Sequence, residues 1–345
     1  MSGSRLRHLL VTGGAGFIGS AFVRDRLKAE PQLRITVLDK LTYAGSEENL
    51  AAVALDPRFR FVHGDIGDAA TVDQLAAEVD AIVNFAAESH VDRSLLDAGA
   101  FVQTDVYGTF VLLEAGRKHR HQRFLQVSTD EVYGHVVQGR SREDDPLQPR
   151  SPYSATKAAA EMLVHAYHVS YGQPTVVTRG SNTYGPYQFP EKIIPLFITN
   201  ALANLPLPIY GNGSAVRDYL YVDDHVAGIA RVLEAGEPGS VYNLGAGSEV
   251  SGIEVADTVI ELCGRPPSLK HFVDDRPGHD YRYALDVQRA QTLGWKPKVS
   301  FAQGMRQTVA WYQANETWWR RRKSAEFWDY YRRNYKSLPV NALPT

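Results

Sequence analysis

The sequence predicts an α/β protein with a doubly wound parallel sheet and a smaller C-terminal domain. Short apolar runs alternate with longer amphipathic stretches through the first 180 residues, which is typical of a parallel sheet covered by helices. Several runs are nearly continuous Val, Ile, Leu and Phe, as expected for strands buried on both faces. From Asn182 onward proline, glycine and aromatic residues become dense, which indicates loops and short elements lining a cleft.

Seven apolar runs are the candidate strands of this sheet. We predict strands at residues 9–11, 35–38, 59–62, 81–85, 124–127 and 175–177. A further run at residues 241–245 predicts that the chain returns to the first sheet before it ends. A helix is predicted from about residue 104 to residue 118, because Phe110, Leu113 and nearby apolar residues recur at helical spacing.

The change in amino-acid composition at Asn182 also predicts two domains. Residues 1–180, with roughly 214–246, are expected to form the first domain, and residues 181–213 with 247–345 the second. The tail after about Leu338 has no apolar anchor and is predicted to be poorly ordered.

The composition excludes several classes of protein. The chain has 345 residues, 44% apolar and 22% charged, with a formal net charge of −2, so no concentrated positive charge favours nucleic acid or an acidic membrane surface. The basic run at residues 320–323 is interpreted as a solvated helix face, with a phosphate patch as the alternative. Cys263 is the single cysteine, and no apolar run approaches the ~18 residues of a membrane span. We expect a cytoplasmic protein without nucleic-acid or membrane partners.

Three glycines after the first strand predict a dinucleotide site. In Thr-Gly-Gly-Ala-Gly-Phe-Ile-Gly, Gly13 permits a tight turn, Gly16 lets the backbone approach a pyrophosphate, and Gly19 allows close helix packing. Asp39 ends the second strand 20 residues after Gly19, where a carboxylate can bind the adenosine ribose and repel a 2′-phosphate. This spacing predicts a Rossmann-type domain that binds NAD rather than NADP, although the neighbouring Lys40 weakens that preference. The alternative is a structural turn.

Asp65 and Ile66 follow the third strand and are expected to flank the adenine. The alternative for Asp65 is a helix cap.

Two groups of residues have the pattern of a catalytic site. Thr129, Asp130 and Glu131 follow the fifth strand, and ligands meet open α/β sheets at the carboxyl ends of strands. Two adjacent carboxylates at such an edge suit one acid and one base with separated pKa values. Tyr153 and Lys157 are spaced i and i+4 on one face of an apparent helix. A lysine ammonium beside the phenol would favour the phenolate, so that the tyrosine can act as a base near neutral pH.

With these motifs the chain resembles the extended short-chain dehydrogenase/reductases, and within them the dTDP-glucose 4,6-dehydratases. Thr-Asp-Glu is the marker of the subfamily, whereas the glycine loop and YxxxK mark only the superfamily. The resemblance covers nearly the whole chain: TGGAGFIG from Thr12, DKLTYAG from Asp39, AAESHVDRS from Ala86, STDEVYG from Ser128, YGPYQFPEK from Tyr184, RDYLYVDD from Arg217 and DRPGHD from Asp275.

The resemblance implies a closed redox cycle on a glucose nucleotide. Tyr153, held by Lys157, would take the proton of the 4-hydroxyl while hydride passes from C4 to NAD⁺. Glu131 would remove the C5 proton, and a protonated Asp130 would donate to the departing 6-hydroxyl. Hydride then returns to C6, which gives a 4-keto-6-deoxy sugar, and Thr129 would hydrogen-bond the sugar near the 4-oxygen.

The resemblance also assigns binding residues and an assembly. It places Phe17, Ile18, Lys40, Thr42, Ala86, Ala87, Thr104 and Thr183 around the cofactor, and Ser89, Asn182, Lys192, Ile193, Pro208, Tyr210, Arg217, Arg276 and His279 around the sugar nucleotide. Arg217 and Arg276 suit a diphosphate, because guanidinium groups bind its oxygens in forks; the alternative for each is a surface ion pair. The helices from about Thr104 and from Tyr153 are expected to pair with a second copy as a four-helix homodimer interface. No His/Cys cluster has metal-ligand spacing, so no metal is predicted.

Two positions depart from the family, and several functions stay open. Thr183 stands where a second asparagine usually follows Asn182, and Gly252 where an asparagine often contacts the nucleotide. The enzyme alternatives are a UDP-glucose 4,6-dehydratase, a UDP-hexose 4-epimerase and a UDP-glucuronate decarboxylase. Asp130 argues against the last two. A non-catalytic NAD-binding sensor is the alternative from another class.

Overall fold

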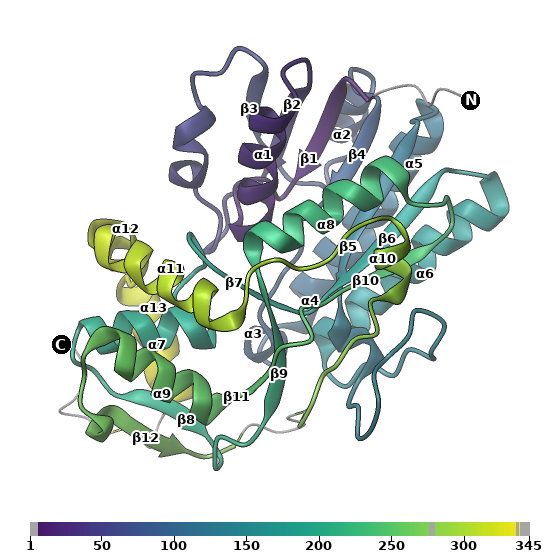
Figure 1. The fold of residues 1–345 in the computed structure, drawn as a ribbon. Coiled ribbons are helices and arrows are strands. Elements are labelled where there is room, and N and C mark those ends of the chain that lie inside the picture. Colours follow the sequence, from purple (N-terminus) through teal and green to yellow (C-terminus); the bar gives the residue numbers. More distant parts are fainter. Residues whose placement is uncertain (1–5, 276–279, 336–337, 339–345) are drawn as a thin grey trace.

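The core is a seven-stranded parallel sheet with strand order β10-β6-β5-β4-β1-β2-β3 (Figure 1). It is seen in a computed structural model that describes residues 6–275, 280–335 and 338. All seven predicted strands are confirmed, including the late return to the sheet, and so is the predicted fold class. The strands are β1 (His8–Thr12), β2 (Arg34–Asp39), β3 (Phe59–His63), β4 (Ala81–Asn84), β5 (Arg123–Thr129), β6 (Thr175–Gly180) and β10 (Val241–Leu244).

Helices cover both faces of this sheet. Helices α1 (Phe17–Ala29) and α8 (Val222–Ala235) pack on one face, and α2 (Ala69–Ala76), α5 (Thr109–Lys118) and α6 (Pro152–Tyr171) cover the other. On β1, Leu9 and Val11 join the apolar cluster under α1 and α8, whereas Leu10 joins the cluster under α2 and α5. Because alternate residues are buried on opposite faces, the strands have continuous apolar sequences.

The predicted helix at residues 104–118 is confirmed, including its end at Lys118, but the helical stretch begins earlier and its first part is not α-helical. The chain is helical from α4 (Ala98–Phe101) through a π-helical segment, η2 (Val102–Gly108), and on through α5. The hydroxyl of Thr109 donates to the carbonyl of Asp105 at 2.6 Å at the end of the π segment. A π-turn holds one more residue than an α-turn, and such turns are frequent at functional sites. An apolar periodicity cannot reveal this insertion, because the buried face continues through it.

The C-terminal part has two small sheets and its own aromatic core. One sheet has the order β11-β9-β7 and the other pairs β12 with β8. Tyr184, Phe197, Tyr312, Trp319 and Tyr331 are among its largest buried side chains. The elements are β7 (Asn182–Tyr184), β8 (Leu207–Tyr210), β9 (Val216–Tyr221), β11 (Glu249–Ser251), β12 (Lys270–Val273), α7 (Ile193–Leu202), α9 (Gly252–Cys263), α11 (Phe301–Ala314), α12 (Glu316–Arg322) and α13 (Ala325–Asn334).

Short helices complete the described chain. They are η1 (Glu47–Val53), α3 (Val91–Ser94), η3 (Asp130–Tyr133), η4 (Pro267–Leu269) and α10 (Gln288–Thr292). No helix in the described ranges is long and apolar enough to cross a membrane.

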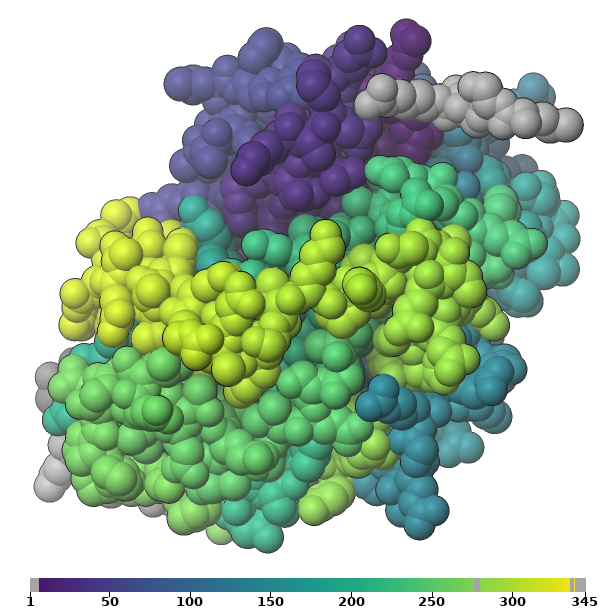
Figure 2. Space-filling model, in the orientation of Figure 1, coloured from purple at the N-terminus to yellow at the C-terminus, as the bar shows by residue number. Residues whose placement is uncertain are grey.

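The basic run at residues 320–323 joins the two parts of the molecule. Arg321 and Arg322 both pair with Glu48 of η1, at 2.5 and 3.0 Å, and the Trp318 indole donates to Asn49. Figure 2 shows the yellow C-terminal residues lying between the purple N-terminal part and the green part. The predicted solvated face is confirmed for Arg320 and Arg321 and is wrong for Lys323, which is buried and donates to Asn200 at 2.6 Å. The predicted disordered tail after Leu338 lies outside the described residues.

Candidate active site

Two cavities meet at the carboxyl edge of the large sheet. The first lies over the glycine loop and the ends of β2, β4 and β5, and the second lies among β7, β8, α7 and β9. Residues from β5 to α7 line both cavities, namely Glu131, Asn182, Thr183, Gln188, Glu191 and Lys192. A ligand in one cavity can therefore meet a ligand in the other beside Glu131.

The glycine loop has the tight geometry that the sequence predicts. Gly13 has a φ of +68°, and a Cβ there would lie 2.5 Å from the backbone nitrogen of Ala86. At Gly19 a Cβ would lie 2.3 Å from the carbonyl oxygen of Gly13. Helix α1 begins at Phe17, directly after this loop, so its first N–H groups point into the first cavity. That is the arrangement of an anion site at a helix N-terminus.

Asp39 and its neighbours form the far end of the first cavity. The buried Asp39 carboxylate accepts hydrogen bonds from the backbone of Ala15 and Leu41, each at 2.8 Å. Lys40 pairs with Asp65 at 2.6 Å, so its charge is already matched by a carboxylate. Asp68 caps α2, which rules out the cap interpretation of Asp65.

The structure brings all the predicted cofactor residues together. The first cavity is lined by Gly13, Gly16, Phe17, Ile18, Gly19, Asp39, Lys40, Thr42, Asp65, Ile66, Ala86, Ala87, Thr104, Tyr153, Lys157 and Thr183. Ser89, Thr129, Asp130 and Glu131 line it too. Their roles in binding remain predictions.

Tyr153 and Lys157 lie on the first turns of α6. Ser151 caps this helix and Pro152 occupies its first position, which sets the helix start just before Tyr153. The Lys157 ammonium donates to the carbonyl of Val127 on β5 at 2.8 Å. The sequence predicts that Lys157 lowers the pKa of Tyr153, and this prediction is wrong for the protein without its cofactor. Burial raises the pKa of Tyr153 well above its usual value, and the charges of Glu131 and Asp105 raise it further.

Asp130 has the environment of a neutral acid. Its side chain is 2% exposed, and its Oδ2 has no hydrogen-bond partner among the described residues. Burial raises the pKa of Asp130 well above the usual range, as do the charges of Glu131 and Asp218, and Arg217 opposes them only in part. Thr129 donates to the Asp130 carboxyl group at 3.2 Å and accepts from the Glu131 backbone amide at 3.3 Å, which holds the Asp130 side chain and the Glu131 backbone at the cavity edge.

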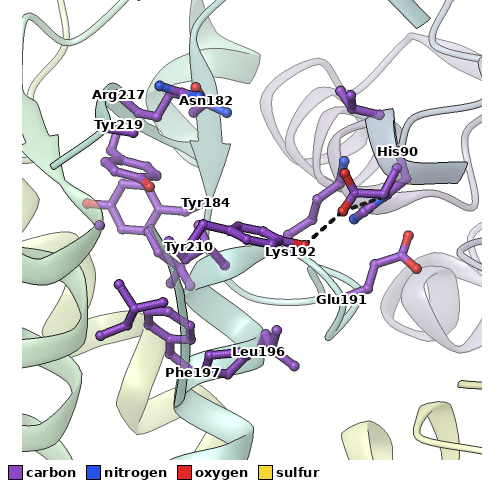
Figure 3. A pocket seen from close by; sticks show the side chains of 18 of the residues that line it. His90, Asn182, Tyr184, Glu191, Lys192, Leu196, Phe197, Tyr210, Arg217 and Tyr219 are labelled. Carbon is purple, nitrogen blue, oxygen red and sulfur yellow. Dashed lines mark hydrogen bonds and ion pairs between the residues drawn. The ribbon is translucent and has the colours of Figure 1, made fainter. Parts of the chain in front are cut away.

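The second cavity collects most of the predicted sugar-nucleotide residues. It is lined by Asn182, Lys192, Ile193, Pro208, Tyr210 and Arg217, as well as by Gly252. Arg276 and His279 lie outside the described residues. Figure 3 shows Arg217 and Asn182 beside each other at one end of this cavity, with Tyr210 nearer to His90.

Two of these side chains are held in place by neighbours. Arg217 is 8% exposed, stacks on the Tyr283 ring at 4.5 Å and donates to the carbonyls of Val216 and Asp280 at 2.8 Å. Arg217 is therefore not the surface ion pair that was the alternative. Asn334 donates to the Tyr210 hydroxyl at 2.7 Å, so α13 supports this wall of the cavity.

Sequence reasoning missed two buried side chains at this site. His225 lines the first cavity, lies 2.7 Å from Thr183, and has its pKa lowered to about 4 by burial. Asp105 lies beside Thr156 and Lys157, and burial raises its pKa to about 6. His225 directly follows the RDYLYVDD run and Asp105 directly follows Thr104. Adjacency to a motif is thus the signal that could have found them. In the described ranges no group of three or more His, Cys, Asp or Glu side chains is arranged to hold a metal ion.

Comparisons with known proteins agree with this geometry. Residues 10–308 match the family model described as GDP-mannose 4,6 dehydratase. A dTDP-glucose 4,6-dehydratase of Actinoplanes sp. is 50% identical over 317 residues, which are 90% of this chain and 99% of that protein. One from Streptomyces griseus is 51% identical, over 90% of this chain and 96% of its own. The crystal structure of DesIV, a dTDP-glucose 4,6-dehydratase from Streptomyces venezuelae with NAD bound, superposes with a TM-score of 0.90 at 49% identity, covering 92% of this chain and all of that one.

Proposed function

The chain belongs to the GDP-mannose 4,6-dehydratase family, and we propose that within this family it is an NAD-dependent dTDP-glucose 4,6-dehydratase. The product is dTDP-4-keto-6-deoxyglucose. The observation that carries this proposal is the position of Thr129, Asp130 and Glu131 where the cofactor cavity meets the second cavity. A carboxylic acid beside a carboxylate suits the removal of water from neighbouring carbons, in which one group donates a proton and the other removes one.

The first cavity fits NAD on the evidence of its own residues. The space that side chains would fill at Gly13 and Gly19 is occupied by backbone, and the N-terminus of α1 opens toward it. Asp39 lies at the adenosine end, where a carboxylate favours a ribose hydroxyl over a phosphate. When bound, NAD accepts a hydride from C4 of the sugar and later returns one to C6.

Tyr153 and Lys157 carry out the proton chemistry of the oxidation. The phenol oxygen of Tyr153 takes the proton of the 4-hydroxyl, and the cationic Lys157 stabilises the phenolate that this requires. The polypeptide alone opposes that phenolate, because Tyr153 is buried near Glu131 and Asp105. Tyr153 therefore depends on positive charge supplied by Lys157 and by the oxidised cofactor.

Asp130 and Glu131 then divide the elimination between them. The 4-ketone acidifies the C5 hydrogen, and the Glu131 carboxylate removes it as a proton. The C6–oxygen bond breaks as Asp130 donates its proton to the leaving hydroxyl, which departs as water. Hydride adds to C6, and the proton on Glu131 returns to C5. The buried environment that keeps Asp130 protonated matches its part as the acid.

The second cavity supplies the nucleotide contacts. We propose that Arg217 binds the diphosphate, because its guanidinium is held by backbone carbonyls at the cavity wall. Asn182, Lys192, Ile193, Pro208 and Tyr210 would contact the remaining nucleotide and sugar, together with Ser89. The resemblance adds Arg276 and His279 to this set. The similarity to relatives named dTDP-glucose 4,6-dehydratases supports a thymidine rather than a uridine nucleotide as the substrate.

We further propose a homodimer through the helices on one side of the sheet. Val102, Phe110, Met162 and Val169 are each at least 40% exposed, and they lie on η2, α5 and α6. Large apolar side chains gathered on neighbouring helices are typical of a protein interface. We also propose a cytoplasmic enzyme of deoxysugar biosynthesis, a role that fits a chain with a single cysteine and a nicotinamide cofactor.

We retain as a proposal the predicted division into domains at residues 1–180 with roughly 214–246, and at 181–213 with 247–345. Strand β10 and helix α8 pack with the large sheet, which supports the first set. Strand β9 pairs with β7 and β11, so the boundary near residue 214 runs through a small sheet.

The proposal is tested by incubating the enzyme with dTDP-glucose, UDP-glucose or GDP-mannose without added NADH. We expect a 4-keto-6-deoxy product from dTDP-glucose and no net change in the cofactor. A 4-epimer, or reduced cofactor accumulating in proportion to the sugar, would contradict the proposal. Absence of turnover with every nucleotide despite bound NAD would favour the non-catalytic sensor.

A further inference from the structure

Asp105 is a buried carboxylate beside the Tyr–Lys pair, and nothing in the proposed reaction uses it. It lies in the π-helical segment η2 and is 2% exposed. Its Oδ1 accepts from the backbone amide of Glu88 at 3.0 Å, and its Oδ2 accepts from the Thr156 hydroxyl at 2.9 Å. Thr156 precedes Lys157 and contacts the carbonyl of Tyr153 at 2.9 Å. Asp105 therefore connects the wall of the cofactor cavity to the catalytic turn of α6.

The hydrogen bonds of Asp105 do not explain why it carries a charge. An asparagine could accept from the Glu88 amide with its oxygen and donate to the Thr156 oxygen with its nitrogen. The Thr156 hydroxyl would then donate to the Tyr153 carbonyl, and every partner would stay satisfied. Burying a carboxylate is costly unless an opposite charge compensates for it. The negative charge of Asp105 therefore calls for a cation nearby that compensates for its burial.

Lys157 is a buried cation on the same turn of α6 as Thr156, which donates to Asp105. Burial lowers the pKa of Lys157, and Asp105 and Glu161 are the carboxylates that oppose this effect. Glu161 is already bound by Arg179, through contacts of 2.6 and 2.9 Å. Of the two carboxylates that act on Lys157, Glu161 is bound to an arginine and Asp105 is not.

The surroundings of Asp105 contain few other titratable groups. On α6, Tyr153 and Lys157 lie on the same turn as Thr156, the hydrogen-bond partner of Asp105, and in the loop after β4 the Glu88 amide donates to Asp105. Helix α4 has the sequence Ala-Gly-Ala-Phe and carries no titratable side chain. On α5, Glu114 and Arg117 pair with each other at 2.9 Å, and Lys118 pairs with Asp73 at 2.7 Å. The charge of Asp105 thus acts mainly on the Tyr–Lys pair.

We propose that Asp105 is a positioning residue of the oxidation step, whose carboxylate is the counter-charge that keeps Lys157 protonated beside Tyr153. This inference rests on the proposed function, because it deepens the part played by Tyr153 and Lys157. The same carboxylate opposes the Tyr153 phenolate. Asp105 therefore sets the pH range in which the pair works.

The variant Asp105→Asn tests the charge while keeping the shape and the hydrogen bonds. Its activity with dTDP-glucose is measured from roughly pH 5 to pH 10. Because the negative charge is lost, both limbs of the pH profile should move to lower pH by about one unit. Thr156→Val is the matched control. It removes a hydrogen bond to Asp105 but no charge, so it should lower the rate without moving the limbs.

A second readout needs no substrate. The ultraviolet difference absorbance of tyrosinate is titrated in NAD-loaded wild type and Asp105→Asn, with Tyr153→Phe as the blank. The signal assigned to Tyr153 should appear at lower pH in Asp105→Asn. If this variant does not fold, Asp105→Ser takes its place, since water can enter the space that it leaves.

The outcomes separate this inference from the proposed function. Unshifted limbs together with an unshifted tyrosinate titration would overturn the inference, even if the wild type turns over dTDP-glucose normally. No turnover by the wild type at any pH would overturn the proposed function. The tyrosinate titration would still decide the part played by Asp105.

Discussion

The cofactor cavity and the sugar-nucleotide cavity are built in different ways. The cofactor cavity uses backbone and small residues from a few continuous motifs, with Gly13 and Gly19 packed against backbone atoms. The sugar cavity uses long side chains from distant segments, such as Arg217 on β9 and Tyr210 held by Asn334 of α13. We therefore expect ligand binding in the cofactor cavity to be impaired by substitutions that add atoms. In the sugar cavity, we expect it to be impaired by substitutions that remove side-chain atoms.

The largest expected effect on ligand binding is that of an added methyl group in the cofactor cavity. In Gly19→Ala the new Cβ would lie 2.3 Å from the Gly13 carbonyl oxygen and 2.9 Å from the Gly14 Cα, and these backbone atoms cannot rotate away. We expect NAD affinity to fall on the order of a hundredfold, since overpacking costs about 1–3 kcal/mol. Equilibrium NAD binding measures this effect.

The matched control adds the same methyl group to the sugar cavity. In Gly252→Ala the nearest atom to the new Cβ is the Gly213 carbonyl oxygen at 3.4 Å, which is ordinary contact. NAD binding should be unchanged and turnover should stay close to that of the wild type. Equal damage from both substitutions would contradict the difference between the two cavities.

The next effect concerns the pH dependence of stability at the floor of the cofactor cavity. The pKa of His225 is about 4 in the folded state, against 6.5 for an exposed histidine. Between these values the unfolded chain binds a proton that the folded chain excludes, so the free energy of unfolding falls as pH drops from 6.5 to 4. The loss is about 3 kcal/mol.

Urea unfolding at about pH 7 and about pH 4.5 checks this loss. The variant His225→Gln should lose less stability between the two conditions than the wild type does. Asp105 works in the opposite sense, because its folded pKa is raised to about 6, so its protonation stabilises the folded chain as pH falls. Asp105→Asn should therefore be more sensitive to acid than the wild type. Equal acid sensitivity of all three proteins would count against these assignments.

The smallest of these effects is expected for a lost side chain in the sugar cavity. Arg217→Ala removes the guanidinium proposed to bind the diphosphate. We expect KM to rise about tenfold to a hundredfold with a smaller change in kcat, because hydrogen bonds to charged groups contribute about 1.5–3 kcal/mol. Steady-state kinetics with dTDP-glucose, and inhibition by dTDP, measure it.

Arg231 provides the control for this substitution. It lies on α8 with 47% of its side chain exposed, so Arg231→Ala should leave KM unchanged. A fall in kcat without a change in KM for Arg217→Ala would place this arginine at the reacting carbons instead.

The cofactor cavity could be predicted from the sequence more fully than the sugar cavity, because its residues belong to a few continuous motifs. Gly13, Gly19 and Asp39 are predictable because backbone geometry demands particular residue types at fixed spacing. Tyr153 and Lys157 are predictable because one helical turn separates them. Apolar runs locate the seven strands, because the sheet is covered on both faces.

The features that escape prediction depend on tertiary burial. The raised pKa of Tyr153 comes from desolvation and from carboxylates on other segments, which spacing within a helix cannot show. Asp105 accepts from Thr156, 51 residues away in the chain, and it does so from a π-helical segment. The hydrogen bond from Asn334 to Tyr210 spans 124 residues of the chain. Contacts of this kind leave no local pattern in the sequence.

The central claim is that Asp130 is the protonated acid that releases water from C6. The variant Asp130→Asn keeps the shape of this side chain but cannot donate the proton. In a single turnover with dTDP-glucose, C4 oxidation should proceed and the absorbance of the reduced cofactor should persist, while formation of the 4-keto-6-deoxy product slows by about 10²–10⁴. Product formation at the wild-type rate, or an equal loss of both steps, would contradict the account.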